Sequence, residues 1–535
     1  MEHIGWLSLS RQCGVNISDY NKEGIYILRD CHLIGCFYCI LWLDASNRGC
    51  FQTVISFFVS FETLDQPSFA GFVESMTENG ISINDWELYI MLFLVFLGIV
   101  ASLITFSGGG QAFSHWAEKR ITTRKGSLFL PFVLGLVIFI DDYFNALTVG
   151  NTSRPLTDRY RVSRAKLSYI VDSTSAPICV IAPMSSWGAY IIGIFASIFA
   201  ANQIIEFSPL QAFIYTIPIN FYALIALIFI VLVIVFNIDV GAMKQHEDRA
   251  KKENQLTDPA KGEVPGSLSE DLTMAHGRVS QLFIPILVLV VATVGMMLYT
   301  GAQGASHDGV DVTVLTVMEY TDIGLSLLIG SAIGLVVTMG MTLMARPNKS
   351  DFGKAVMAGI QSMLPAIGIL VLAWTTIEMI GLLGTGNYLA SLIDQSIHPG
   401  FLPVLLFLVA FAFSGLATGT SWGTFGMLLP IAAQIAVVVE PTMLIPMLAA
   451  VLAGSIFGDH ISPISDTTIL SAAGSGAHHM DHVITQLPYA ILTAVLATIA
   501  FFILGFLGAV IAWIVVGILL TITVFILQRV SKKET

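Results

Sequence analysis

Long apolar runs separated by short polar stretches make up most of this chain. Segments of roughly 18 or more apolar residues recur, and each can cross a hydrocarbon core of about 30 Å as a helix. Examples are residues 86–106, 212–236, 283–299, 323–344 and 443–459. The pattern predicts an all-α polytopic membrane protein.

Some runs carry polar side chains where the membrane interior is expected. Residues 128–153 contain Asp141, Asp142 and Asn145 and have basic clusters on both sides. Because Lys and Arg accumulate on the cytoplasmic side, both ends of this segment should face the cytoplasm. We therefore expect a re-entrant hairpin, which is tolerated only where the backbone lines a cavity or is buried in protein. The alternative is an ordinary helix followed by a long basic loop.

Other runs are expected to form broken helices. Residues 169–201 exceed the ~20 residues that one span needs, and polar stretches with proline interrupt them at 172–177 and 183–186. Further interruptions are predicted at 375–378, 414–415 and 419–424. Residues 212–236 contain no comparable polar stretch and should form one clean span.

The break at residues 457–468 is the most polar and lies at the centre of our interpretation. A charge at mid-bilayer costs about 3 kcal/mol or more, so such groups are normally functional and paired. Pro463 cannot donate to a helix ladder, and Gly458 lets the backbone approach closely. The freed carbonyls, carboxylates and hydroxyls all offer oxygen, the ligand that hard cations prefer.

Four parts can be distinguished along the chain. Residues 86–236 form the first transmembrane half, 237–280 a cytoplasmic linker and 281–530 the second half. The linker is rich in charged residues, Pro and Gly, which predicts a solvated, disordered connection. Residues 1–65 hold five of the six cysteines and mix charges into apolar runs. They are either a degenerate or frame-shifted segment or a divergent first helix over residues 35–59.

The two halves resemble each other weakly in sequence. Residues 139–142 match 457–460 at an offset of 318 (457 − 139), and 166–169 match 486–489 at an offset of 320 (486 − 166). Each half also has a Ser-Trp-Gly break, at residues 186–188 and 421–423. Interrupted segments at matching positions of two halves indicate a transport site.

Composition supports the membrane assignment. The chain is 55% hydrophobic and 12% charged, whereas soluble proteins carry about 25% charged residues. The net charge of −12 says little about partners, because loop charges report orientation. No cysteine pattern typical of zinc sites or disulfide frameworks occurs, and we expect no cofactor and no nucleic-acid partner.

Five motifs, taken together, resemble the NhaC-type sodium/proton antiporter family. They lie at residues 140–143, 150–155, 172–177, 419–423 and 458–467. The resemblance covers residues 86–530 and implies two repeats, each with a re-entrant hairpin. The family includes sodium/proton exchangers and exchangers of small organic anions such as malate and lactate. The first sixty or so residues do not fit its pattern.

The predicted activity is secondary active antiport of sodium and protons, with a role in pH homeostasis. One site must hold either ion, and a buried carboxyl can do so because burial raises the pKa of such a group towards the working range. We expect Asp459 and Asp466 to serve here, with Asp141 and Asp142 as the matching pair. The neutral oxygen ligands would be Asn151, Thr152, Thr174, Thr420, Ser421, Ser462, Ser465 and Thr467.

Several of these residues also have structural interpretations. Asp141 or Asp142 could cap a half-helix, Asp466 could pair with a loop arginine, and Asp172 could cap a helix near the interface. Glu378 could serve the site or make a polar contact between helices. For His460 a structural, hydrogen-bonded role is favoured, and for Trp187 and Trp422 a packing role is favoured. A polar arm at residues 474–486 is expected to be a solvated face; it holds His478, His479, Asp481 and His482.

Other functions are less well supported by the residues. An organic-anion exchanger should have a cation near its site, and Arg154 is the only clear candidate. An intramembrane aspartyl protease typically carries Gly-x-Gly-Asp, but Ile456 occupies the first position. No uniform ring of pore-lining residues indicates a channel. We expect a multi-pass transporter, not an enzyme, in the inner membrane of a bacterium, with homodimerisation left open.

Overall fold

The computed structural model describes residues 59–60, 82–83, 85–262, 277–313, 316–317, 320–383 and 398–533. The chain divides into two compact units, residues 1–84 and 85–535. In the first unit, strands β1 (Val59–Ser60) and β2 (Ser82–Ile83) pair antiparallel. The predictions for residues 1–65 lie outside the described residues, apart from the two of β1.

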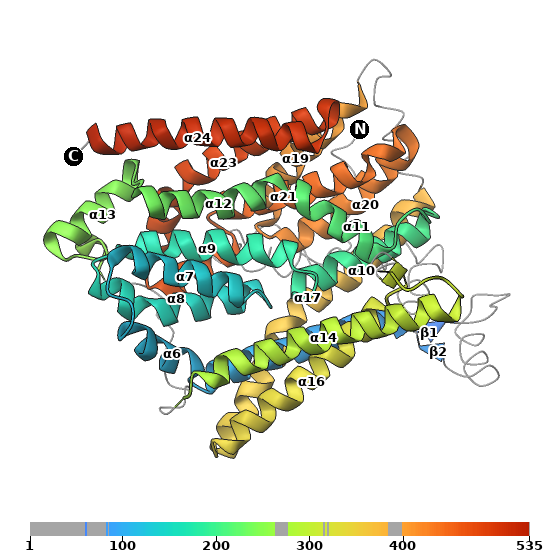
Figure 1. Ribbon diagram of the computed structural model, residues 1–535, viewed down its shortest axis with the longest axis horizontal. Helices are drawn as coiled ribbons and strands as arrows, with labels where there is room; N and C mark the ends of the chain where they lie inside the picture. Colours follow the sequence, from blue (N-terminus) through green and yellow to red (C-terminus); the bar gives the residue numbers. More distant parts are fainter. Residues whose placement is uncertain are drawn as a thin grey trace, which may run out of the picture. The chain divides into compact units, whose positions relative to one another are not determined.

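The second unit is helical throughout its described part. Within the residues that the structure describes, nine helical segments are long and apolar enough to cross a membrane, or up to ten if one bent pair counts as a span. Their long axes run roughly alongside one another in Figure 1. The prediction of an all-α polytopic membrane protein is confirmed.

Four helices of this unit pack mainly on one another. They are α5 (Asp85–Phe106), α14 (Ser280–His307), α16 (Ile323–Met344) and α17 (Lys349–Leu383). A Cβ added at Gly98 of α5 would lie 2.4 Å from the Gly359 carbonyl oxygen, so glycine is needed where α5 and α17 cross. The predicted interruption at 375–378 is wrong, because α17 continues through it. That stretch contains neither Pro nor Gly, the residues that commonly break a helix.

The predicted first hairpin is present. Helices α7 (Arg124–Val137) and α8 (Asp142–Arg159) flank a short break, and the Tyr160 hydroxyl after α8 donates to the Ile121 carbonyl before α7 at 3.0 Å. With 14 residues, α7 is only about 21 Å long, too short to cross a bilayer. The chain therefore leaves the hairpin near the point at which it entered.

The next segment has one break rather than two. Helix α9 (Arg164–Ile181) continues unbroken through 172–177, so the prediction of a break there is wrong. Its polar side chains are satisfied without unwinding: Thr174 donates to Ile170 O at 2.7 Å, and other side chains donate to Asp172. The second predicted break is confirmed, because α9 ends before 182–185 and α10 (Ser186–Ala201) follows.

Residues 212–236 do not form the clean span that we expected. Helix α11 (Pro209–Thr216) leads into a 3-10 turn, η1 (Ile217–Ile219), and α12 (Phe221–Phe236) continues after a 47° bend. Pro218 in the turn has no N–H to donate, which explains the bend.

The second half contains the same kinds of breaks. Helix α19 (Leu402–Ala412) passes into a π-helical stretch, η5 (Phe413–Thr418), and α20 (Ser421–Val439) begins after Gly419 in the left-handed conformation. Helix α21 (Leu444–Ile461) ends at the predicted polar break, and α22 (Asp466–Ser475) follows. The breaks expected at 414–424 and 457–468 are confirmed.

Helix boundaries correct the register of the internal repeat. Helices α9 and α21 each have 18 residues and are offset by 280 (444 − 164), and α10 and α22 begin at the same offset (466 − 186). The break sequences Ile-Ala-Pro-Met-Ser-Ser at 181–186 and Ile-Ser-Pro-Ile-Ser-Asp at 461–466 then align. The offsets of 318 and 320 are wrong, because short matches in apolar sequence arise easily by chance.

The expected polar arm at 474–486 is mostly helix. Helix α23 (His479–Leu507) begins within it, and His482, Thr485 and Gln486 are fully buried. His478 and Asp481 are buried as well, so a solvated face is wrong for these two residues and for His482. Helix α24 (Ala509–Lys533) follows Gly508 and ends the described chain.

The linker is more ordered than its composition predicted. Helix α13 (Gly241–Glu253) and the short η2 (Pro259–Lys261) occupy its first half, whereas residues 263–276 lie outside the described range. Buried Glu247 of α13 forms ion pairs with Arg124 and, at 4.0 Å, with Lys166, so α13 is fastened to the starts of α7 and α9. These ion pairs explain why a charged helix docks here.

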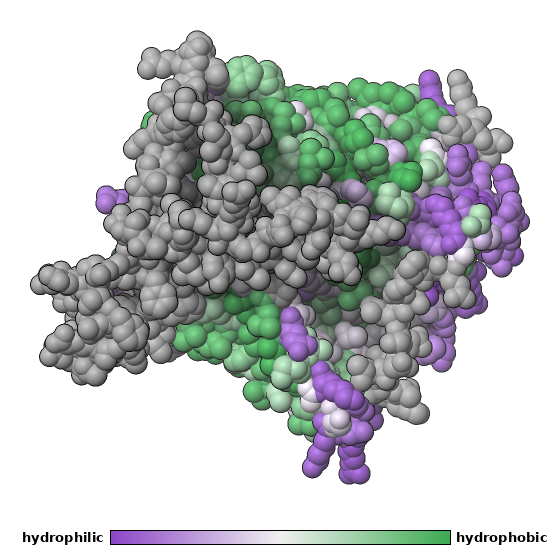
Figure 2. All heavy atoms as spheres, turned by 180° about the vertical axis from the view of Figure 1, so that it is seen from behind, coloured by the Kyte–Doolittle hydropathy of each residue, from purple (hydrophilic) through white to green (hydrophobic). Residues whose placement is uncertain are grey.

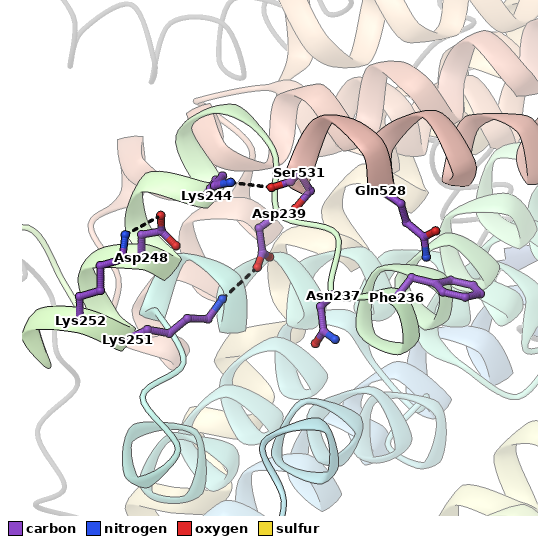
Figure 3. A pocket seen from close by; sticks show the side chains of 9 residues that line it. All are labelled: Phe236, Asn237, Asp239, Lys244, Asp248, Lys251, Lys252, Gln528 and Ser531. Atoms are coloured by element: carbon purple, nitrogen blue, oxygen red, sulfur yellow. Dashed lines mark hydrogen bonds and ion pairs between the residues drawn. The ribbon is translucent and has the colours of Figure 1, made fainter. Parts of the chain in front are cut away.

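Hydrophobic and hydrophilic side chains are separated on the surface of the helical unit. Hydrophobic side chains cover broad parts of the flanks in Figure 2, and hydrophilic ones gather at the end where α13 lies in Figure 1. At that end a pocket lies between α12, α13 and α24, where Lys251 pairs with Asp239 at 3.3 Å and Lys244 donates to the Ser531 carbonyl (Figure 3).

Replacement of Gly458 by Ala should destabilise the contact of α21 with η5 and the end of α19. The added Cβ would lie 2.6 Å from the backbone nitrogen of Gly415, which cannot move independently of its helix. We expect a loss of about 1–3 kcal/mol, seen as a lower Tm in detergent. Gly295→Ala is the matched control, because nothing lies within 4 Å of its Cβ. Equal Tm values for the two variants would contradict this packing.

Acid should weaken the attachment of α13. Burial raises the pKa of Asp239, but Lys166 and Lys251 outweigh this effect and hold that pKa below its usual 3.8. Its contribution to stability is therefore complete above pH 3.8 and lost as the pH falls through the lower, folded value. Asp239→Asn should lower Tm at pH 7, with the difference from wild type disappearing only below about pH 4. Asp248→Asn, at a more exposed pair, should have little effect.

Candidate functional site

The four helix breaks of the two repeats meet at one place. The Ser186 backbone N–H donates to the Ile140 carbonyl at 2.8 Å, joining the two breaks of the first repeat. A Cβ added at Gly419 would lie 2.8 Å from Ile464, joining the two breaks of the second. The Tyr190 hydroxyl donates to the Trp422 carbonyl at 2.8 Å and connects the repeats.

Four helices begin at these breaks, namely α8, α10, α20 and α22. The N-terminus of a helix has unpaired N–H groups and a partial positive charge, which favours nearby carboxylates. Asp141, Ser185 and Ser465 each accept a backbone N–H as the N-cap, whereas Thr420 forms no such bond. The breaks thus supply local positive potential without any basic side chain.

Asp141 is buried and has two partners. It accepts the Phe144 backbone N–H at 2.9 Å and the Ser186 hydroxyl at 2.9 Å. The alternative that one of the two neighbouring aspartates caps the half-helix is confirmed for Asp141.

Asp459, a carboxylate of the second half, is fully buried. It accepts the Ser421 hydroxyl at 2.9 Å and also the Ser465 hydroxyl, whose oxygen is 3.0 Å from that of Thr467. Each half therefore holds one aspartate with the serine that begins the helix after a break. Three predicted residues, Ser421, Ser465 and Thr467, lie together here.

Asp142 is unlike its neighbours. It is fully buried, and neither carboxylate oxygen accepts a hydrogen bond of normal geometry among the described residues, although the Trp187 side chain acts on it as a donor. Asp141, Asp459 and Asp466 all act on it electrostatically, so four acidic side chains share one region. A buried polar atom without a partner is rare and costs about 1–3 kcal/mol, which points to an ion or a proton as its partner.

Further oxygens near the breaks also lack partners within the described residues. The Thr420 and Ser462 hydroxyls belong to two of the breaks, and Ser414 lies in η5 against α21. All three are buried. Together with Asp142, these neutral oxygens could supply the mixed ligand set that a hard cation requires.

Asp466 is only half-buried. It accepts the Tyr143 hydroxyl and the Thr467 backbone N–H, the latter at 2.9 Å. The alternative considered from the sequence was a loop arginine, but the structure places the Tyr143 phenol of the other half there. Tyr143 was not singled out in the sequence, although its position next to two aspartates is a usable signal.

Three predicted ligands lie away from the carboxylates. Asn151 is exposed on α8, nine residues and therefore about 13 Å beyond Asp142. Thr152 contacts α6 (Gly109–Glu118), since a Cβ at Gly110 would lie 2.7 Å from its hydroxyl. Thr174 packs against Gly135 of α7. The structure does not bring these residues to the breaks.

The aromatic residues and His460 have packing partners. Trp187 and Trp422 are buried and meet edge-to-face with ring centroids 5.9 Å apart. His460 Nδ1 is 3.0 Å from the Tyr222 hydroxyl, which agrees with the structural role favoured for this histidine.

Asp172 was misjudged from the sequence. It was expected to cap a helix near the interface, but it lies fully buried within α9 and accepts hydrogen bonds from α22 and α23. The available signal was the pair His482 and Gln486, which are four residues apart and share one helix face ahead of an apolar run.

Among the described residues, no three His, Cys, Asp or Glu side chains converge in a metal-binding arrangement. Any cation held at the breaks would therefore be bound by few carboxylates and several neutral oxygens.

Comparison with known proteins gives consistent matches. A family model described as the Na+/H+ antiporter family matches residues 178–506. An uncharacterized protein of Haemophilus influenzae is 45% identical over 425 residues, covering 78% of this chain and 79% of the relative.

Two other relatives match a shorter stretch. A malate-2H(+)/Na(+)-lactate antiporter of Bacillus subtilis is 34% identical over 161 residues, covering 29% of this chain and 33% of its own. An uncharacterized Na(+)/H(+) antiporter of Haemophilus influenzae is 34% identical over 152 residues, covering 27% and 31%. The match therefore spans about a third of the length of each of these two relatives.

One solved structure, the YdaH transporter of Alcanivorax borkumensis, matches with a TM-score of 0.48 at 12% identity. The match covers 88% of this chain and 97% of that protein.

Proposed function

The chain belongs to the Na+/H+ antiporter family, and from this we propose that it exchanges sodium for protons across the inner membrane of a bacterium. Asp142 and Asp459 would be the carboxylates of the exchange site. Ser421, Thr420, Ser462 and Ser465 would supply neutral oxygens, with Asp141 and Asp466 shaping the surrounding field.

One observation carries this proposal: the carboxylate of Asp142 is fully buried and accepts no hydrogen bond of normal geometry in the described chain. A charge in this position is stable only with a cation beside it, and without the cation the group must take up a proton. The same oxygens then bind sodium or a proton but not both. Exclusive occupancy of this kind is what an antiporter needs in order to couple two ions.

Asp459 differs from Asp142 in its surroundings. Two serine hydroxyls already donate to it, which stabilises its charged form. We therefore assign Asp459 to sodium coordination and Asp142 to the step in which the proton replaces sodium. The helix N-termini at the breaks would offset the negative charge when neither ion is bound.

Exchange of organic anions is the second candidate. It is favoured by the similarity to the Bacillus subtilis relative, whose name gives malate, lactate, protons and sodium. An anion would be held by the helix N-termini and a cation. Arg154, the cation considered from the sequence, lies beside Gly476 at the end of α22 and not at the breaks. This placement favours sodium as the ion exchanged at the carboxylates.

Everted membrane vesicles can test the exchange. Respiration acidifies their interior, and addition of sodium should release protons and reverse the quenching of a pH-sensitive dye. Asp459→Asn and Asp142→Asn should each reduce this response at least about tenfold, because each removes a group that must carry charge.

Asp311→Asn, in an exposed loop, is the matched control and should leave the response unchanged. A response to malate or lactate without any to sodium would support the second candidate. A full sodium response in both site variants would contradict the site.

Sodium should also stabilise the purified protein. At a concentration 100 times Kd, a ligand that binds only the folded state adds about 2.7 kcal/mol. We expect sodium to raise the Tm of the wild type but not of Asp142→Asn, whose sodium-free Tm should equal or exceed that of the wild type. Choline at equal ionic strength is the control. An equal sodium effect on both proteins would exclude Asp142 from the site.

A further inference from the structure

Asp172 gathers an unusual number of donors for a residue outside the site. Its Oδ1 accepts the Ser471 hydroxyl at 3.1 Å. Its Oδ2 accepts the Gln486 side-chain amide at 2.6 Å, and the Thr468 hydroxyl and His482 Nε2 each lie 3.3 Å from it. Four side chains of α22 and α23, in the second half, thus converge on one carboxylate of the first half.

Two of these donors also contact a second acceptor. The Gln486 amide nitrogen lies 2.8 Å from the His460 carbonyl, and the Thr468 hydroxyl lies 3.2 Å from the Asp459 carbonyl. Both carbonyls belong to the last turn of α21, which ends at Ile461. The last carbonyls of a helix lack the usual partner within it. The Asp459 carbonyl also accepts the backbone N–H of the C-cap residue Ser462 at 3.2 Å, and the His460 carbonyl accepts the Gln486 side chain.

Electrostatics makes these bridging donors necessary. The C-terminus of a helix carries a partial negative charge, and Asp172 adds a carboxylate close to it. The two groups would repel each other if no donor lay between them. The Gln486 NH2 group can donate to both groups, and the Thr468 hydroxyl shares its single hydrogen between them. His482 is a further donor to Asp172 in the tautomer that carries its hydrogen on Nε2.

We propose that Asp172 is a positioning residue for Asp459. Through Gln486 and Thr468 it holds the last turn of α21 and so determines where the Asp459 carboxylate meets Ser421 and Ser465. The kinetic part of this inference rests on the proposed role of Asp459 in ion exchange. At the repeat offset of 280, Asp172 corresponds to Leu452, so only one repeat contains this device.

A positioning role has a specific kinetic signature. Sodium needs several oxygens at fixed positions, whereas a proton needs only one. Displacement of Asp459 should therefore weaken sodium binding and leave the competition with protons intact. The KM for sodium should rise by the same factor at every pH around neutrality, with little change in maximal rate.

The test compares Asp172→Asn and Gln486→Leu in the vesicle assay. The asparagine keeps the shape but presents an NH2 group to the surrounding donors, and the leucine removes the bridge. Each should raise the KM for sodium about tenfold, and the double variant should be no worse than Asp172→Asn, because both disrupt one chain of contacts. Asp172→Glu, which keeps the charge, should restore part of the affinity.

Thr493→Val is the matched control, since that buried hydroxyl donates to the Tyr489 carbonyl of its own helix at 2.9 Å. An unchanged KM in Asp172→Asn, with a rate reduced only in proportion to the protein present, would overturn the proposal in favour of a folding role. If the KM of Asp172→Asn no longer depended on pH, the positioning role would also be overturned, because Asp172 would then itself exchange the proton.

A separate measurement distinguishes this proposal from the proposed function. If the wild type moves no protons in response to sodium, the exchange function fails, and the positioning role is judged by hydrogen exchange in the purified protein. Backbone amides at 456–461 should then exchange about fivefold faster in Asp172→Asn and Gln486→Leu than in Thr493→Val. Equal exchange in all three variants would overturn the positioning role.

Discussion

The structure depends on one constraint: polar groups removed from water must find partners within the protein. Four interrupted helices place unpaired N–H groups, carbonyls and carboxylates in an apolar interior, and most of these polar groups satisfy one another. Serines at the starts of helices donate to Asp141 and Asp459, and Asp172 binds donors from the opposite half. Among the four aspartates near the breaks, Asp142 is the exception, because neither of its oxygens accepts a hydrogen bond of normal geometry within the described residues.

The repeat explains how two halves build one site from different residues. At matching positions Asp142 corresponds to Ser421 (offset 279), and Ser186 corresponds to Asp466 (offset 280). In both pairs, an aspartate in one half aligns with a serine in the other half. The breaks lie at matching positions of the two halves, but the side chains at them differ. The two halves therefore provide a mixed set of oxygens rather than two identical clusters.

Much of the architecture could be predicted from the sequence, because apolar length and proline or glycine breaks act locally. The spans, the first hairpin and the breaks near Gly419 and Pro463 follow from such signals. The environment of Asp172 could not be predicted, since it depends on residues about 300 positions away. Docking of α13 was missed for the same reason: its charged side chains indicate solvent unless the distant Arg124 and Lys166 are known to face them.

The mismatch between the repeats has a consequence for the evolution of the chain. If the two halves arose from one duplicated unit, the copies have since become mutually dependent: Asp459 aligns with Cys179, and Asp172 with Leu452. A dimer of two first halves would lack Asp459, and a dimer of two second halves would lack Asp172. Neither dimer would contain the full set of side chains found in this chain. A symmetric ancestor would therefore have placed a different set of side chains at its breaks.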